Sequence, residues 1–205
     1  VPGDPAFDTP RRILLAAFVV LALADAVVAG RGRRAPRLGA ALLVVIGLVT
    51  LTAAFGWGGG VVQGVPVAVL FLLLLAVTGG TFAAMVLGHW YLVTPALPPR
   101  PLIEMTRVLT WLLVLQLVLF WLWTALGSGP DGRPFGALVG TSAVFVWLML
   151  GIGLLFPLGV VAMANRTART RSMESATGLL YIATAAVLAA TIVAAGLFFG
   201  TGLLA

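Results

Sequence analysis

VPVAVLFLLLLAVTGGTFAAMVLGHWYLV, residues 65–93, decides the fold of this chain. The stretch contains no Asp, Glu, Lys or Arg. About 20 apolar residues are enough for a helix to cross the ~30 Å hydrocarbon core of a bilayer. Residues 65–93 therefore predict a transmembrane helix that is long enough to tilt or to protrude from the membrane.

Similar apolar stretches occur on both sides of this one, separated by connections rich in Gly, Pro or Arg. The predicted transmembrane helices cover about residues 12–29, 38–57, 65–93, 103–126, 136–164 and 173–204. Because the connections are short, we predict a single all-α transmembrane domain, a bundle of six helices over residues 1–205.

Proline and glycine modify two of these helices. Pro157 lies inside the fifth stretch, where it cannot donate a hydrogen bond to the carbonyl of Gly153, and it predicts a kink. Two pairs of glycines have the four-residue spacing of small-residue helix contacts, namely Gly136 with Gly140 and Gly196 with Gly200.

The composition agrees with a membrane protein. Of the 205 residues, 61% are hydrophobic and 9% are charged, whereas a soluble domain has about 25% charged residues. The net charge of +6 comes from arginines in the connections, which favours topology signals and contacts with anionic lipid over nucleic-acid binding. The absence of cysteine excludes thiolate catalysis, iron–sulfur ligation and c-type haem attachment.

The arginines also predict the orientation. Nine of the 12 basic residues fall on the side of the connections near residues 30–37, 100–107 and 165–172. By the positive-inside rule this side faces the cytoplasm, so both termini face outward. The arginine-only basic set and the richness in Ala, Gly, Val and Leu indicate GC-rich coding, and hence a bacterial inner membrane. The expected partners are the lipid bilayer and other membrane subunits.

Polar side chains that titrate or donate protons are costly in a membrane helix, so they mark candidate functional positions. Under the predicted topology they gather toward the cytoplasmic ends of their helices. We predict that six residues form or flank a cofactor site: His89, Tyr181, Glu174, Glu104, Arg107 and Asp25.

His89 is the only histidine and is predicted to share a helical face with Thr78, Thr81 and Met85. It can act as an axial ligand to the metal of a haem or chlorin, or donate a hydrogen bond to a quinone carbonyl. The alternative is an anchor at the membrane boundary together with Trp90 and Tyr91. One histidine per chain cannot build a bis-histidine haem, so the second ligand would be Met, an open position or a partner's histidine.

The carboxylates have structural and functional interpretations. Glu104 and Arg107 are three residues apart and can form an ion pair at the start of the fourth helix. Asp25 either pairs with loop arginines or relays protons. Glu174 opens the sixth helix, after Ser172 as a candidate N-cap, and its spacing predicts a polar stripe with Thr177, Tyr181 and Thr184.

These residues lead to three functional hypotheses. The first is a membrane subunit of a respiratory or photosynthetic electron-transfer complex, without catalysis of its own, beside a quinone, haem or chlorin site. The second is a small oligomeric transporter or channel, suggested by Pro157, the Gly79–Gly80 pair and Gln116. The third is a purely structural assembly subunit. The sequence contains no His and Glu residues at the spacing of a metal-binding motif, and no motif for a catalytic nucleophile.

Overall fold

The computed structural model describes residues 3–94, 96–128 and 132–204, and this part of the chain is helical, without strands. Short 3-10 turns, η1 (Pro5–Phe7) and η2 (Gly136–Leu138), precede helices α1 and α5. The long helices are α1 (Asp8–Gly30), α2 (Pro36–Gly58), α3 (Val61–Val93), α4 (Arg100–Ala125) and α7 (Met173–Thr201). Between α4 and α7 the chain forms α5 (Ala143–Leu148), the π-helix η3 (Met149–Leu155) and α6 (Phe156–Arg169).

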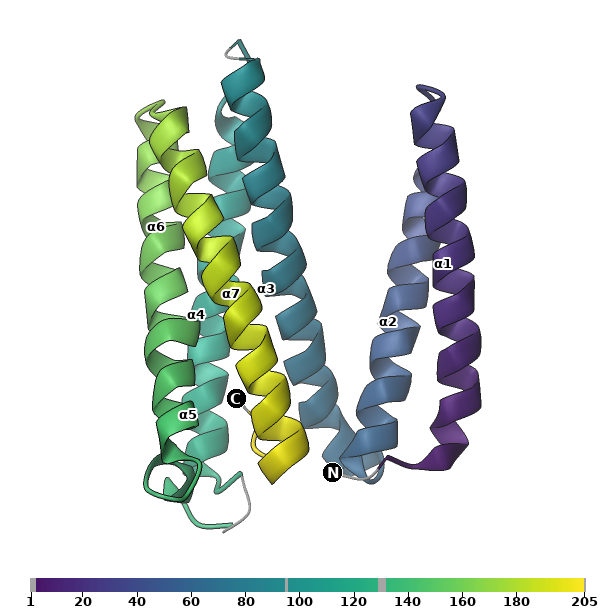
Figure 1. Ribbon diagram of the computed structural model, residues 1–205, viewed down its shortest axis with the longest axis vertical. Coiled ribbons are helices and arrows are strands. Elements are labelled where there is room, and N and C mark those ends of the chain that lie inside the picture. The colour runs from purple at the N-terminus through teal and green to yellow at the C-terminus, as the bar shows by residue number, and fades with distance from the viewer. Residues whose placement is uncertain (1–2, 95, 129–131, 205) are drawn as a thin grey trace. The chain divides into compact units, whose positions relative to one another are not determined.

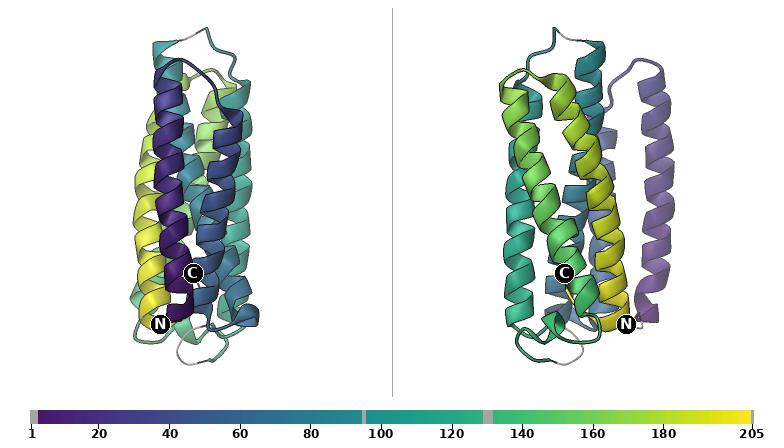
Figure 2. Two further views of the ribbon diagram at one scale, coloured as in Figure 1. Left: turned by 90° about the vertical axis from the view of Figure 1, so that its right-hand side faces the viewer. Right: turned by 60° about the vertical axis from the view of Figure 1, so that its left-hand side comes forward.

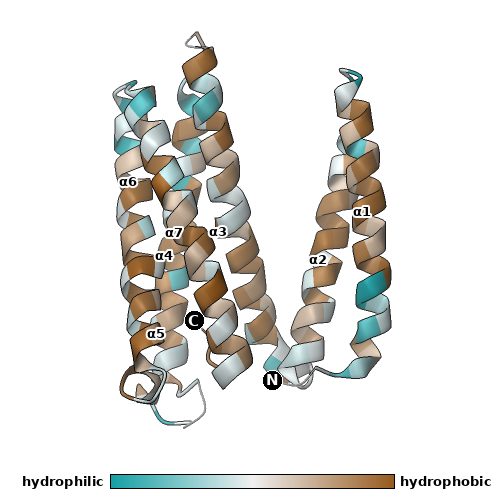
Figure 3. Ribbon diagram, in the orientation of Figure 1, coloured by the Kyte–Doolittle hydropathy of each residue, from teal (hydrophilic) through white to brown (hydrophobic). Residues whose placement is uncertain are grey.

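Six helical spans among the described residues are long and apolar enough to cross a membrane, which confirms the predicted multi-pass fold. Figure 3 shows hydrophobic residues along most of each helix, with hydrophilic residues concentrated toward the helix ends. The orientation relative to the cytoplasm stays a prediction.

The fifth span departs most from the sequence prediction, which had one helix over residues 136–164. Its α-helix begins only at Ala143, because the chain before it forms the turn η2, and the Trp147 indole donates a hydrogen bond of 3.1 Å to the Leu138 carbonyl of that turn. The predicted Gly136–Gly140 helix contact is therefore wrong.

The predicted disturbance at Pro157 takes the form of a π-helix. Directly before this proline the chain winds wider over Met149–Leu155, and the N–H of Phe156 bonds to the carbonyl of Gly151, five residues earlier. Proline has no N–H to continue the regular ladder, so a local change of winding redistributes the backbone hydrogen bonds. Helix α6 then continues to Arg169, beyond the predicted end.

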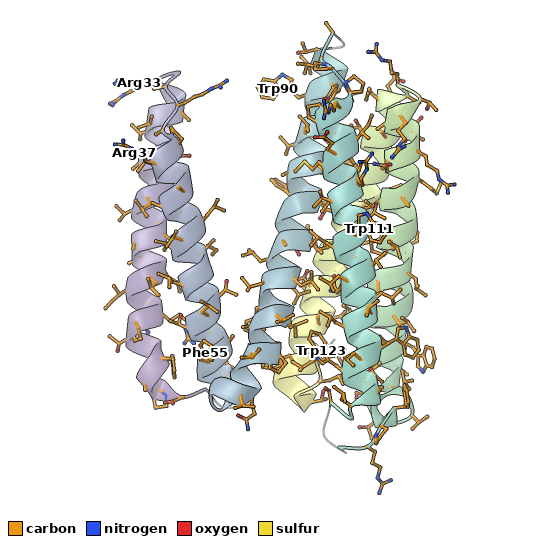
Figure 4. The ribbon with its side chains drawn as sticks, turned by 180° about the vertical axis from the view of Figure 1, so that it is seen from behind. Arg33, Arg37, Phe55, Trp90, Trp111 and Trp123 are labelled. Atoms are coloured by element: carbon orange, nitrogen blue, oxygen red, sulfur yellow. The ribbon has the colours of Figure 1, made fainter. Side chains whose placement is uncertain are left out.

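The helices form two compact units, the first ending at Leu72 and the second beginning at Leu73, within α3. In the first unit α1 and α2 form an antiparallel hairpin (Figure 2). Figure 4 shows Arg33 and Arg37 at the end of this hairpin. At the other end Arg11 lies 4.6 Å from the centre of the Trp57 ring. The prediction of a single domain stays a prediction.

In the second unit α4, α6, α7 and the later part of α3 lie side by side (Figures 1 and 2), around a core of aliphatic side chains. Threonines join α3 to α7. The hydroxyl oxygens of Thr78 and Thr191 are 2.9 Å apart, and the Thr184 hydroxyl is 3.4 Å from the carbonyl of Thr81. Small and hydroxyl-bearing residues let membrane helices approach closely, and they supply interhelical hydrogen bonds there.

Candidate functional site

A cavity of about 610 Å³ lies at the end of the second unit where α3 ends and α7 begins. We call it the α3–α7 cavity. The residues that line it are Tyr91, Leu92, Leu97, Pro99, Arg171, Ser172, Met173 and Glu174. A guanidinium, a carboxylate and a hydroxyl thus share one cavity with apolar side chains. Such a mixed lining is typical of sites for small molecules with a polar head.

The turn between α6 and α7 places Arg171 at the cavity. The N–H of Ser172 bonds to the Thr167 carbonyl (3.1 Å), and the N–H of Arg171 bonds to the Ala168 carbonyl (3.2 Å), which together form a Schellman motif. Arg171 occupies the left-handed position of this motif, with φ 61°. Glycine is the usual residue there, since a side chain costs roughly 1–2 kcal/mol in this conformation. Strain of this kind clusters at functional sites.

Tyr91 fixes the opposite wall of the cavity. Its side chain is only 3% exposed, and its hydroxyl donates a hydrogen bond to the carbonyl of Pro98 in the α3–α4 connection. The ring belongs to the core that also contains Leu102 and Leu180. The alternative interpretation of Tyr91 as an anchor at the membrane boundary is therefore wrong, because its ring packs inside the helix unit.

The start of α7 supplies the polar edge of the cavity. Ser172 holds the predicted N-cap position, but its side chain makes no capping bond; its hydroxyl donates to the Ser175 hydroxyl at 3.0 Å. Glu174 follows in the first turn and is exposed. The hydroxyl of Thr177, one turn further along, is buried without a hydrogen-bond partner among the described residues.

His89, the predicted ligand, does not line the cavity. It is exposed on α3, as is its neighbour Trp90, which projects outward in Figure 4, whereas Gly88 and Tyr91 are buried. Thr81 and His89 do not share the predicted helical face. Residues spaced four apart shift progressively around the helix axis, and over the eight residues between these two the shift is about 80°. His89 has no hydrogen-bond partner within the described part of the chain, and its imidazole is free to ligate.

The predicted ion pair between Glu104 and Arg107 is not formed. Glu104 instead accepts a hydrogen bond of 2.7 Å from the guanidinium of Arg100, one turn earlier on α4, and both side chains are exposed. Residues three and four apart on a helix both lie on one side of it, so the sequence spacing does not distinguish Arg100 from Arg107 as the partner of Glu104. Arg107 is exposed and forms no ion pair with any residue that the structure describes.

The predicted polar stripe on α7 separates into two rows. Thr177 and Thr184 are buried, while Glu174 and Tyr181 are exposed. The rows lie on adjacent faces of the helix, one against the core and one outside it. Of the predicted site residues only Glu174 reaches the cavity, and Asp25 belongs to the first unit, so that its membership of the cluster stays a prediction.

The sequence interpretation missed a polar link between α4 and α6 at the same end of the unit. The Asn165 amide donates to the Ile103 carbonyl and to the Thr106 hydroxyl, both at 2.8 Å. Its oxygen accepts a hydrogen bond of 3.0 Å from Arg169. Asn165 falls in a predicted connection, but in the structure it lies one turn before the end of α6, where an amide is a signal for such a link.

Comparison of the chain with protein-family models, curated proteins and solved structures finds no significant match. The functional argument therefore depends on the geometry of the site. Among the described residues no three His, Cys, Asp or Glu side chains come together to hold a metal ion. His89 is the residue that can bind the metal of a tetrapyrrole as a single axial ligand.

Proposed function

We propose that the protein is a membrane subunit of a multi-subunit electron-transfer complex, respiratory or photosynthetic, and contributes to or packs beside a quinone or tetrapyrrole site. The observation that carries this proposal is the α3–α7 cavity, in which Arg171, Ser172 and Glu174 adjoin Leu92, Leu97 and Met173. By the positive-inside rule, the arginine distribution predicts that this end of the helices faces the cytoplasm.

The lining of the cavity matches the chemistry of a quinone. A quinone ring presents carbonyl oxygens, which accept hydrogen bonds from the Arg171 guanidinium. The apolar walls, among them Leu92 and Met173, contact the ring and the start of its tail. Reduction of a quinone consumes protons, and the exposed carboxylate of Glu174 connects the cavity with water for their delivery.

A tetrapyrrole would occupy a different place. Because His89 faces away from the core of the second unit, a haem or chlorin bound to it lies on the outside of α3. The chain has one histidine, so a second histidine ligand to a haem comes from a partner subunit. This arrangement makes His89 part of an interface between chains rather than of the α3–α7 cavity.

The test is to purify the protein with its partners in mild detergent and to measure its visible spectrum, oxidised and after reduction with dithionite. Extracted quinone is quantified by chromatography, and co-purifying chains are identified by mass spectrometry. We expect His89→Ala to remove a Soret or chlorin band if a tetrapyrrole is bound. We expect Glu174→Gln and Arg171→Ala to lower the bound quinone several-fold.

Glu104→Gln is the matched control for the cavity variants. Glu104 is an exposed carboxylate at the same end of the unit, but it does not line the cavity. Equal loss of quinone in Glu104→Gln and Glu174→Gln would argue against the cavity as the site. Purification without pigment, without quinone and without partner chains would overturn the proposal as a whole.

A transporter or channel is the second candidate, and one observation favours it. The π-helix η3 interrupts the fifth span and packs against α4, where Gln116 is buried. Interrupted helices and buried polar side chains near the middle of the membrane are features of substrate sites in transporters. Substrate flux in proteoliposomes that Gln116→Leu abolishes would support this candidate. Wild-type protein without flux, pigment or quinone would leave a purely structural subunit.

A further inference from the structure

A second cavity lies at the opposite end of the second unit, between the start of α5 and the end of α7. It measures about 480 Å³, and we call it the α5–α7 groove. The residues that matter for the argument are Thr141, Ser142, Phe145, Ile192, Gly196 and Thr201. None of the hypotheses from the sequence uses this groove, and it is separate from the α3–α7 cavity.

The groove is polar at one end and apolar at the other. Thr141 and Ser142 directly precede α5, and Thr201 ends α7, so their hydroxyls lie at the ends of two spans that are long and apolar enough to cross a membrane. Ile192 lies nine residues before Thr201 on α7, which puts it about 14 Å deeper. A ligand that fits this gradient has its head at the membrane boundary and its apolar part among the hydrocarbon chains.

Two hydroxyls at the boundary are free to bind the head of a ligand. The side chains of Thr141 and Ser142 have no hydrogen-bond partner within the described residues. The hydroxyl of Thr201 donates to the Leu197 carbonyl at 2.7 Å and accepts a hydrogen bond of 3.4 Å from the N–H of Leu203, which leaves it one accepting lone pair. No charged side chain lines the groove. The head is therefore neutral, because a phosphate or ammonium group would meet no counter-charge.

The groove is accessible from the lipid side. Ile192 is 74% exposed and Phe145 is 57% exposed, so the apolar part faces the surrounding bilayer. A Cβ built on Gly196 meets no other atom within 4 Å, which shows that the glycine leaves open space in the groove wall. A molecule dissolved in the membrane can enter sideways and pack against the Phe145 ring.

We propose that the α5–α7 groove binds a neutral, membrane-dissolved amphiphile whose head carries carbonyl or hydroxyl oxygens. Thr141 and Ser142 bond to the head, and Phe145 and Ile192 contact its apolar part. Both an isoprenoid quinone and an uncharged glycerolipid have this chemistry. The proposal is independent of the α3–α7 cavity and of the electron-transfer function.

The experiment is native mass spectrometry of the full chain released from detergent micelles with one of three probes. Decylubiquinone and dioleoylglycerol are the neutral probes, and dioleoylphosphatidylglycerol is the anionic one. Gly196→Leu adds an apolar side chain to the groove wall, where its Cβ meets no other atom within 4 Å. Gly200→Leu is the matched control, since Gly200 also has open space around its Cβ, lies one turn further along α7 and does not line the groove.

We expect the wild type and Gly200→Leu to retain at least one neutral probe, and Gly196→Leu to lose it at least tenfold. Ser142→Ala combined with Thr141→Val should weaken binding several-fold, because the head then lacks its donors. The neutral probe that is retained identifies the source of the ligand. Binding of neither neutral probe, equal binding by Gly196→Leu and Gly200→Leu, or preference for the anionic probe would overturn the proposal.

Discussion

Arg171 combines an unfavourable backbone conformation with a place in the wall of the α3–α7 cavity. The Schellman turn at the end of α6 would be satisfied equally well by glycine. An arginine at this position therefore weakens the turn, and its side chain lines the cavity. At the residue scale, backbone strain at a cavity wall is the observation that supports the proposed ligand site.

Replacing Arg171 should separate stability from binding. Arg171→Gly relieves the left-handed strain and is expected to raise the free energy of unfolding by about 1 kcal/mol. Arg171→Ala removes the same guanidinium but keeps the strain, so its stability should stay near that of the wild type. Thermal unfolding in detergent measures the change in stability, and the amount of bound quinone measures the change in binding. Both variants should lose the ligand; retention of quinone by both would mean that Arg171 serves only the turn.

The contact between α3 and α7 depends on the absence of a side chain at Gly88. A Cβ at this position would lie 2.8 Å from the Thr177 hydroxyl oxygen and 3.5 Å from a methyl group of Leu180. Because residues of both α3 and α7 line the α3–α7 cavity, the spacing of these two helices affects the geometry of that cavity. Close packing through glycine is the usual way in which membrane helices reach such a distance.

At the scale of the helix pair we predict that Gly88→Ala lowers the free energy of unfolding by about 1–3 kcal/mol, the usual cost of overpacking. Gly79→Ala, on the same helix, is the matched control, since its Cβ would meet no atom within 4 Å. Alanine there should stabilise α3 by up to about 1 kcal/mol through helix propensity. Equilibrium unfolding with a denaturing detergent measures the free energy of unfolding of both variants. Equal changes in Gly88→Ala and Gly79→Ala would contradict the packing argument.

Across the whole chain the arginines are distributed unevenly between alternate connections. The connection between α1 and α2 holds Arg31, Arg33, Arg34 and Arg37, all exposed. The connection between α6 and α7 adds further arginines, whereas the intervening connections contain few. In a membrane this asymmetry is expected to fix the orientation of the chain and to attract anionic lipid to the arginine-rich side.

Cysteine labelling tests the orientation, because the chain has no cysteine of its own. Ala35→Cys lies in the arginine-rich connection and Ser128→Cys follows α4. With both termini outward, a membrane-impermeant maleimide should label only Ser128→Cys in intact spheroplasts. Permeabilised cells provide the control, in which both positions should react. Labelling of Ala35→Cys alone in intact cells would reverse the orientation and place the α3–α7 cavity outside.

The sequence alone determined that this is a six-span helical membrane protein, because length and hydrophobicity of a helix are local properties that the bilayer selects directly. It also located the disturbance before Pro157. The tertiary structure decided which polar residues meet. Glu104 pairs with Arg100, Tyr91 turns inward while His89 turns outward, and Arg171 lines a cavity. Such choices depend on the rotation of each helix about its axis, which packing against neighbouring helices fixes and which a nearly uniform apolar sequence does not encode.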